Sequence, residues 1–65
     1  MSIMRETRQR KLMTIAELAH AVGLTPATIS RYENGQRTPD VETAKSIAEV
    51  LGVPWYQLID NRKAV

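Results

Sequence analysis

The best candidates for a binding surface in this sequence are three residues at helical spacing, Ala27, Arg31 and Asn34. If their segment is a helix with Ile29 facing inward, a step of about 100° per residue puts them within about 60° of one another on the opposite side. Exposed helix faces more often carry paired Glu and Lys, whereas this ridge (Ala27, Arg31 and Asn34) has one arginine among small and amide side chains. Such a surface can enter the major groove of a duplex.

The helix that carries the ridge is predicted over about residues 26–34. Thr25 is a favoured N-cap residue, and Pro26 at the first helical position loses nothing by lacking an N–H. Asn34 and Gly35 form a typical helix stop. Two independent start signals and one stop signal therefore define this segment.

A second helix, predicted over about residues 15–22, must hold the first one in place. Thr14 and Glu17 have the spacing of a capping box, and Gly23 can take the positive φ that ends a helix. Ala19 supplies the small residue needed where two backbones approach. The short turn between the two helices is typical of a helix-turn-helix. The apolar residues expected on its inward sides are Leu18, Val22, Leu24, Ile29 and Tyr32.

Three more helical segments complete the predicted domain of residues 1–60, and residues 61–65 are predicted to be a flexible tail. The first segment runs from about Ser2 to Lys11. The next follows an N-cap at Asp40, and Pro54 opens a short last helix. The expected inward residues of these last two segments are Val41, Ala44, Ile47, Ala48 and Leu51, then Trp55, Leu58 and Ile59.

The chain is short and lacks the residues that most stapled or catalytic small proteins use. It has 65 residues, no cysteine and one histidine, which leaves room for one domain and excludes disulfides and cysteine nucleophiles. We find no catalytic residues, no metal site, no cofactor motif and no evident small-molecule ligand. No apolar stretch approaches the roughly 18 residues of a membrane span, so we expect no membrane partner and a cytoplasmic protein.

The net charge of +2 is unevenly distributed. Residues 1–37 hold six cations and three anions, whereas residues 38–61 hold one cation and four anions. The basic half contains the predicted helix-turn-helix, and it is the candidate face for a polyanion. The alternative is that this uneven charge belongs to a solvated surface that binds no polyanion.

These residues resemble the phage Cro and phage repressor type of helix-turn-helix domain, also called the xenobiotic-response-element family. The resemblance lies in residues 17–19, 22–25, 28–35 and 51–53 and in Pro39. It implies an all-α, compact five-helix bundle of the lambda-repressor-like kind. It also implies a sequence-specific regulator of transcription that binds double-stranded DNA, usually as a homodimer on a near-palindromic operator. Repression by blocking the access of polymerase is the mechanism expected of a chain with no room for an effector or activation domain.

The resemblance also implies which residues contact bases. In such proteins the third helix reads base edges from its first turn and from one residue a turn later, here Pro26, Ala27 and Arg31. Arg31 can donate two hydrogen bonds to guanine O6 and N7, and Ala27 offers apolar contact to a thymine methyl. Thr28 and Ser30 flank the ridge and can reach a base or a phosphate.

Phosphate contacts are expected from helix N-termini and nearby cations. The candidates are Thr14, Ile15, Thr25, Asn34, Arg37 and Arg10. Similar proteins commonly have a glutamine where this chain has Ile15, so that side-chain donor is lost here. They also often have glycine where this chain has Leu12, which predicts a different end for the first helix.

Some residues are better explained by structure than by DNA contact. Arg8 and Glu33 match a pair that forms a salt bridge between the first and third helices of similar proteins. His20 is expected on the surface, and Trp55 in the core, with a dimer contact as the alternative.

Other functions use the same fold. An antitoxin or a restriction-modification controller would also bind DNA, and a protein-interaction adaptor would keep the fold without DNA contact. An adaptor predicts acidic residues on the ridge, which has none. The resemblance implies a bacterial or phage-infected cell, with the protein at the nucleoid when it is bound.

Overall fold

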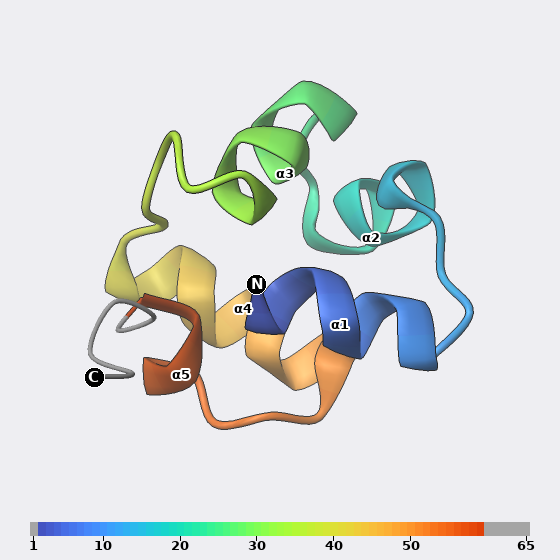
Figure 1. Cartoon of the computed structure of the whole chain (residues 1–65). Helices are drawn as coiled ribbons and strands as arrows, with labels where there is room; N and C mark the ends of the chain where they lie inside the picture. Colours follow the sequence, from blue (N-terminus) through green and yellow to red (C-terminus); the bar gives the residue numbers. More distant parts are fainter. Residues whose placement is uncertain (1, 60–65) are drawn as a thin grey trace.

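The structure, a computed structural model, describes residues 2–59 and contains five α-helices in that range (Figure 1). They are α1 (Ile3–Arg10), α2 (Ile15–Val22), α3 (Pro26–Glu33), α4 (Val41–Leu51) and α5 (Tyr56–Ile59). No strand occurs among these residues, which confirms the all-α five-helix fold. The domain boundary at residue 60 and the tail predicted over residues 61–65 lie outside the described residues.

Side chains cap the starts of the first four helices, which was predicted for Thr14, Thr25 and Asp40. Each cap accepts a hydrogen bond from an amide three residues later, which satisfies a donor that has no partner within the helix. The amides of Arg5, Glu17, Thr28 and Thr43 donate to the side chains of Ser2, Thr14, Thr25 and Asp40, at 3.2, 3.0, 3.3 and 2.8 Å.

The hydrogen bonds from the side chain and amide of Thr43 also lower the pKa of Asp40. They favour the charged carboxylate, so this cap contributes stability above the pKa that Asp40 has in the unfolded chain. That contribution is lost as the pH falls through the lower pKa of the folded state.

Two helices end at glycines with positive φ, and the turn after α1 contains a leucine with positive φ. Gly23 has φ 75°, in line with the predicted helix stop, and Gly52 has φ 76° at the end of α4. Leu12 follows α1 with φ 58°, and its side chain is in water, with 90% of the residue exposed. The chain therefore turns after α1 through the left-handed region that favours glycine, at a cost of about 1–2 kcal/mol for a residue with a Cβ.

The core lies where α2 and α4 meet the other helices. Leu18, Ile29, Ile47 and Leu51 are its largest fully buried side chains, and each contributes about 1.5–3 kcal/mol by burial. Ala19, the small residue predicted at the helix crossing, is 1% exposed. These contacts hold α3 against α2 and α1. The other buried hydrophobic residues are Met4, Ala44, Ala48 and Leu58.

Two details of the predicted helices are wrong. Val41 was expected inward but is 43% exposed. It is the first residue of α4, and because helical side chains lean toward the N-terminus, it leans past the packed layer. The last helix begins at Tyr56, two residues after Pro54. The carbonyls of Pro54 and Trp55 instead accept from amides three residues later, at 3.1 and 3.0 Å, in a tight turn that leads into α5.

Candidate nucleic-acid interface

The third helix lies at an edge of the bundle, with α2 beside it and α1 beneath it in the view of Figure 1. Ile29 is fully buried on the inner side. The three residues of the ridge, Ala27, Arg31 and Asn34, are all exposed. The helix thus has one side that packs and one that is accessible to a partner.

The start of α3 carries the small and apolar part of this surface. Pro26 and Ala27 are exposed, and Thr28 is partly buried. The hydroxyls of Thr25 and Thr28 lie 3.0 Å apart, so one donates to the other and one proton of the pair is left for another acceptor. The first turn has no acidic residue, so the partial positive charge of this helix terminus is not neutralised there.

Arg31 is the cation of the ridge. It is exposed, and its guanidinium forms no hydrogen bond or salt bridge with any residue that the structure describes. A guanidinium has five N–H donors in a fixed plane, a geometry that fits two adjacent acceptors. The donors of Arg31 are thus available to a partner outside the chain.

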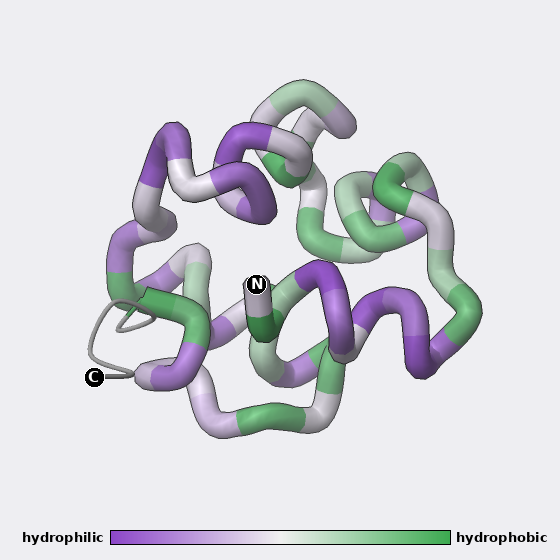
Figure 2. The backbone as a smooth tube through the Cα atoms, viewed as in Figure 1, coloured by the Kyte–Doolittle hydropathy of each residue, from purple (hydrophilic) through white to green (hydrophobic). Residues whose placement is uncertain are grey.

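The end of α3 adds a second cation. Arg37 is exposed, and its amide donates to the carbonyl of Arg31 at 3.3 Å, as does the amide of Gln36 at 2.9 Å. These bonds fold the chain back against the last turn of the helix and hold Arg37 close to it. Figure 2 shows hydrophilic residues from the second half of α3 through this loop.

Asn34 is exposed at the C-cap of α3, and its side chain has partners within the protein. The amide nitrogen donates to the hydroxyl of Ser30 at 3.4 Å, and the carbonyl oxygen accepts from Arg5 at 2.6 Å. Ser30 itself is partly buried. The predicted phosphate contact of Asn34 can thus use only the remaining N–H of its amide.

The start of α2, where Thr14 and Ile15 were predicted to hold a phosphate, has an internal anion. The amide of Thr14 donates to the Glu17 carboxylate at 2.9 Å, and the Thr14 hydroxyl accepts from the Glu17 amide. The side chain of Ile15 packs against the core. The amide of Ile15 has no acceptor within the helix, so this backbone N–H, like the proton of the Thr14 hydroxyl, is available to a phosphate.

The predicted contact residues therefore fall into two groups. One group lies on α3 or within a few residues of it, whereas Thr14, Ile15 and Arg10 belong to other elements. Arg10 is exposed in the last turn of α1. The first group consists of Thr25, Pro26, Ala27, Thr28, Ser30, Arg31, Asn34 and Arg37.

A buried ion pair holds the inner end of α3. Arg8 Nε and Nη2 donate to the two carboxylate oxygens of Glu33 at 2.6 and 3.1 Å, and Arg8 Nη1 donates to the carbonyl of Met13 at 2.8 Å. The hydrogen bond to Glu33 raises the pKa of Arg8 above its ordinary value. Arg5 completes the cluster with a 3.3 Å bond to Glu33. No local pattern in the sequence points to Arg5, because its partners are 28 and 29 residues away.

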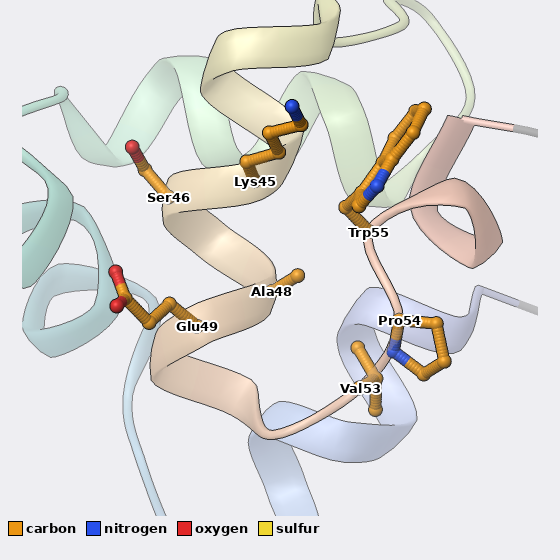
Figure 3. A pocket seen from close by; sticks show the side chains of 7 residues that line it. All are labelled: Lys45, Ser46, Ala48, Glu49, Val53, Pro54 and Trp55. Carbon is orange, nitrogen blue, oxygen red and sulfur yellow. The ribbon is translucent and has the colours of Figure 1, made fainter.

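A groove of about 430 Å³ lies elsewhere, between α4 and residues 53–55 (Figure 3). Trp55 is partly buried there, with the Lys45 ammonium 5.6 Å from its ring centre. No residue predicted to contact DNA lines this groove.

Within residues 2–59, no cluster of His, Cys, Asp or Glu could hold a metal, and no helix is long and apolar enough to cross a membrane.

Known proteins match the chain over nearly all of this structure. A protein-family model described as helix-turn-helix matches residues 4–58. The HTH-type transcriptional repressor RghR of Bacillus subtilis is 39% identical over 57 residues, which are 86% of this chain and 42% of that protein. RghRB of the same organism, described as an uncharacterized HTH-type transcriptional regulator, is 44% identical over 57 residues, 86% of this chain and 41% of that protein.

A more distant relative comes from a phage. The cryptic phage CTXphi transcriptional repressor RstR of Vibrio cholerae is 30% identical over 60 residues, which are 92% of this chain and 54% of RstR. The chain thus spans about two fifths of the two Bacillus proteins and about half of RstR. No solved structure matches the chain.

Proposed function

The chain belongs to the helix-turn-helix family, a DNA-binding family whose members are not enzymes, and on this premise we propose that it represses transcription by binding a specific DNA sequence through α3. Pro26, Ala27 and Arg31 contact base edges in the major groove, with Thr28 and Ser30 beside them. The names of RghR and RstR support repression, because both are described as transcriptional repressors.

The observation that carries the proposal is the environment of Arg31. Arg31 has an exposed guanidinium on a ridge of small and amide side chains, and this guanidinium pairs with no residue that the structure describes. A bidentate contact to guanine O6 and N7 uses two of its donors and discriminates by about 1–3 kcal/mol against the wrong base. The other two residues of the ridge, Ala27 and Asn34, have neither a carboxylate nor a large side chain that would keep the Arg31 guanidinium away from a base.

Contacts to phosphates position α3 on the duplex. The backbone amide of Arg37 donates to the carbonyl of Arg31 and holds Arg37 near the end of α3, and Thr25 is the N-cap at the start of that helix. Asn34, Arg10 and the amides at the start of α2, from Thr14 and Ile15, extend the contact along the backbone of the duplex. Because Glu17 already bonds the Thr14 amide, the start of α2 contributes less than the start of α3.

The binding unit that we propose is a homodimer on a near-palindromic operator. A two-fold dimer places its two copies of α3 in successive major grooves about 34–36 Å apart, so that two half-sites are read at once. One α3 of eight residues contacts only a few base pairs, which is too little sequence to define one site in a genome.

Selection of bound duplexes from a random pool tests sequence recognition, symmetry and spacing together. We expect enrichment of two inverted half-sites about 10 base pairs apart, centre to centre. The matched control is Ala27→Glu, which places a carboxylate on the exposed ridge without touching the core and should enrich nothing.

The outcomes separate the parts of the proposal. Failure of the unmodified protein to enrich any sequence contradicts DNA recognition and favours a protein-interaction adaptor. Enrichment of one half-site alone contradicts the palindromic operator. Equilibrium sedimentation with a palindromic duplex should give two chains per duplex, and one chain per duplex contradicts the dimer.

A further inference from the structure

Arg5 links the first helix to the outer surface of α3. Its side chain is 46% exposed, and its Nε donates to Glu33 at 3.3 Å. Its Nη2 donates to the side-chain oxygen of Asn34, which lies outside the ion pair, at 2.6 Å. One guanidinium thus touches the buried end of α3 and the exposed ridge together.

The contact with Arg5 fixes which way the Asn34 amide faces. Arginine has donors and no acceptor, so the atom of Asn34 that it meets must be the oxygen. The NH₂ group then faces Ser30, and its nitrogen lies 3.4 Å from the Ser30 hydroxyl oxygen. Since an amide nitrogen only donates, the Ser30 oxygen is the acceptor of this bond.

The Ser30 proton is consequently left for a different partner. A hydroxyl in a helix commonly donates to a carbonyl one turn earlier, as Thr7 does to Ile3 at 2.7 Å in α1. None of the hydrogen bonds among residues 2–59 uses the Ser30 proton in that way. Ser30 lies next to Arg31 in sequence and one turn before Asn34, beside the ridge.

We propose that Arg5 is a positioning residue of the DNA-binding surface, which holds the Asn34 amide so that the Ser30 hydroxyl donates its proton to an acceptor on DNA. This inference rests on the proposed function. Acceptors of the required kind are the phosphate oxygens and the acceptor atoms of base edges. Arg5 acts through Asn34 and Ser30 and needs no contact with DNA of its own.

A double-mutant cycle between Arg5 and Ser30 tests the proposal. Binding is measured to the tightest duplex recovered from the random pool and to a shuffled duplex of the same composition. Ser30→Ala should weaken binding by about 2- to 12-fold, the range expected for one hydrogen bond. In the Arg5→Ala background the same change should weaken binding by less than about twofold, because the hydroxyl is no longer oriented. Equal factors in both backgrounds would overturn the proposal.

The two duplexes identify the acceptor. Coupling on the selected duplex alone assigns the Ser30 proton to a base edge, and equal coupling on both duplexes assigns it to a phosphate.

Arg10 provides the matched control, because it is also an exposed arginine of α1 and lies outside the hydrogen bonds that join α1 to α3. Arg10→Ala and Ser30→Ala should be additive, and coupling as large as that of Arg5 would overturn the proposal.

Arg5→Lys separates position from charge. Lysine keeps the positive charge, but its single ammonium cannot reproduce the planar fork that spans Glu33 and Asn34. We expect Arg5→Lys to lose the coupling with Ser30 although the positive charge is kept. Coupling that persists in Arg5→Lys would overturn the role of the guanidinium.

Nuclear magnetic resonance of the free protein tests the same contacts without DNA. Arg5→Ala keeps both bonds between Arg8 and Glu33, and it should shift the side-chain NH₂ resonances of Asn34. Unchanged resonances would overturn this inference alone. Shifted resonances in a protein that selects no duplex would instead overturn the proposed function, and the inference with it.

Discussion

The two sides of α3 use their charges in opposite ways. On the inner side Glu33 is 5% exposed and accepts hydrogen bonds from Arg8 and Arg5. On the outer side the guanidinium of Arg31, two residues earlier, is exposed and has no partner among residues 2–59. The inner charges attach the helix to the bundle, and the outer charge is available to a ligand.

Charge type alone therefore does not distinguish a structural residue from a binding residue in α3. Arg8 and Arg31 are the same residue type, and burial and pairing separate their roles. A buried pair is costly to break because the remaining partner keeps a charge without compensation. An exposed cation can be removed with little effect on stability, so its role must be measured in binding.

The largest expected effect comes from breaking the inner side. Glu33→Ala leaves Arg8, which is 8% exposed, without its carboxylate, and should lower the free energy of unfolding by about 3–5 kcal/mol. Since a domain of this size has a stability of the same order, circular dichroism should show a largely unfolded chain at 25 °C. Glu49→Ala removes an exposed carboxylate and should change stability by less than about 0.5 kcal/mol. A stable Glu33→Ala protein would contradict the assigned role of the pair.

Arg31→Ala should affect only binding. We expect affinity for the selected duplex to fall by about 1–3 kcal/mol, affinity for shuffled DNA to fall far less, and the urea unfolding curve to stay unchanged. Fluorescence anisotropy with both duplexes measures the ratio. Equal losses on the two duplexes would move Arg31 to the phosphate-contacting group.

Arg37→Ala tests the outer side for a contact without sequence preference. Loss of one phosphate contact should weaken binding to all duplexes alike and reduce the slope of log K against log salt by about 0.9. A salt titration of both duplexes gives this slope. An unchanged slope would exclude a phosphate contact by Arg37.

The smallest effect is expected where a helix start already has its own anion. Glu17→Gln removes the negative charge at the start of α2, and its side-chain oxygen can still accept from the Thr14 amide. Affinity for any duplex should rise about two- to fivefold, as the charge no longer opposes a phosphate at this terminus. Glu42→Gln, in the first turn of α4, is the control and should leave binding unchanged. Equal effects of the two changes would show that the start of α2 does not face DNA.

Local patterns predicted most of the fold. The caps at Thr14, Thr25 and Asp40 and the positive φ at Gly23 depend on residues at most a few positions apart, so the sequence contains them directly. The exposed position of Val41 could not be read in this way. Its periodicity matches the buried face, and only the extent of the packed layer leaves it outside.

The site was predicted less completely than the fold. The ridge followed from helical spacing once the inward direction of Ile29 was chosen, and Arg8 with Glu33 followed from resemblance to known proteins. The contact of Arg5 with Asn34 joins residues 29 positions apart and depends on how α1 crosses the end of α3. The bond between Glu17 and Thr14 was predicted as a cap, but its effect on a phosphate at the same amide became clear only from the hydrogen bonds.

The caps also bear on how quickly the chain becomes a folded protein. Each of the first four helices starts with a hydrogen bond between residues three apart, which each segment can form before it meets the others. Starting a helix is the slow and unfavourable part of its formation, and a cap satisfies one of the donors that the first turn leaves open. Helical bundles dominated by local contacts fold within microseconds to milliseconds. Since a ribosome adds about 5–20 residues per second, we expect this chain to fold in far less time than the addition of one residue takes.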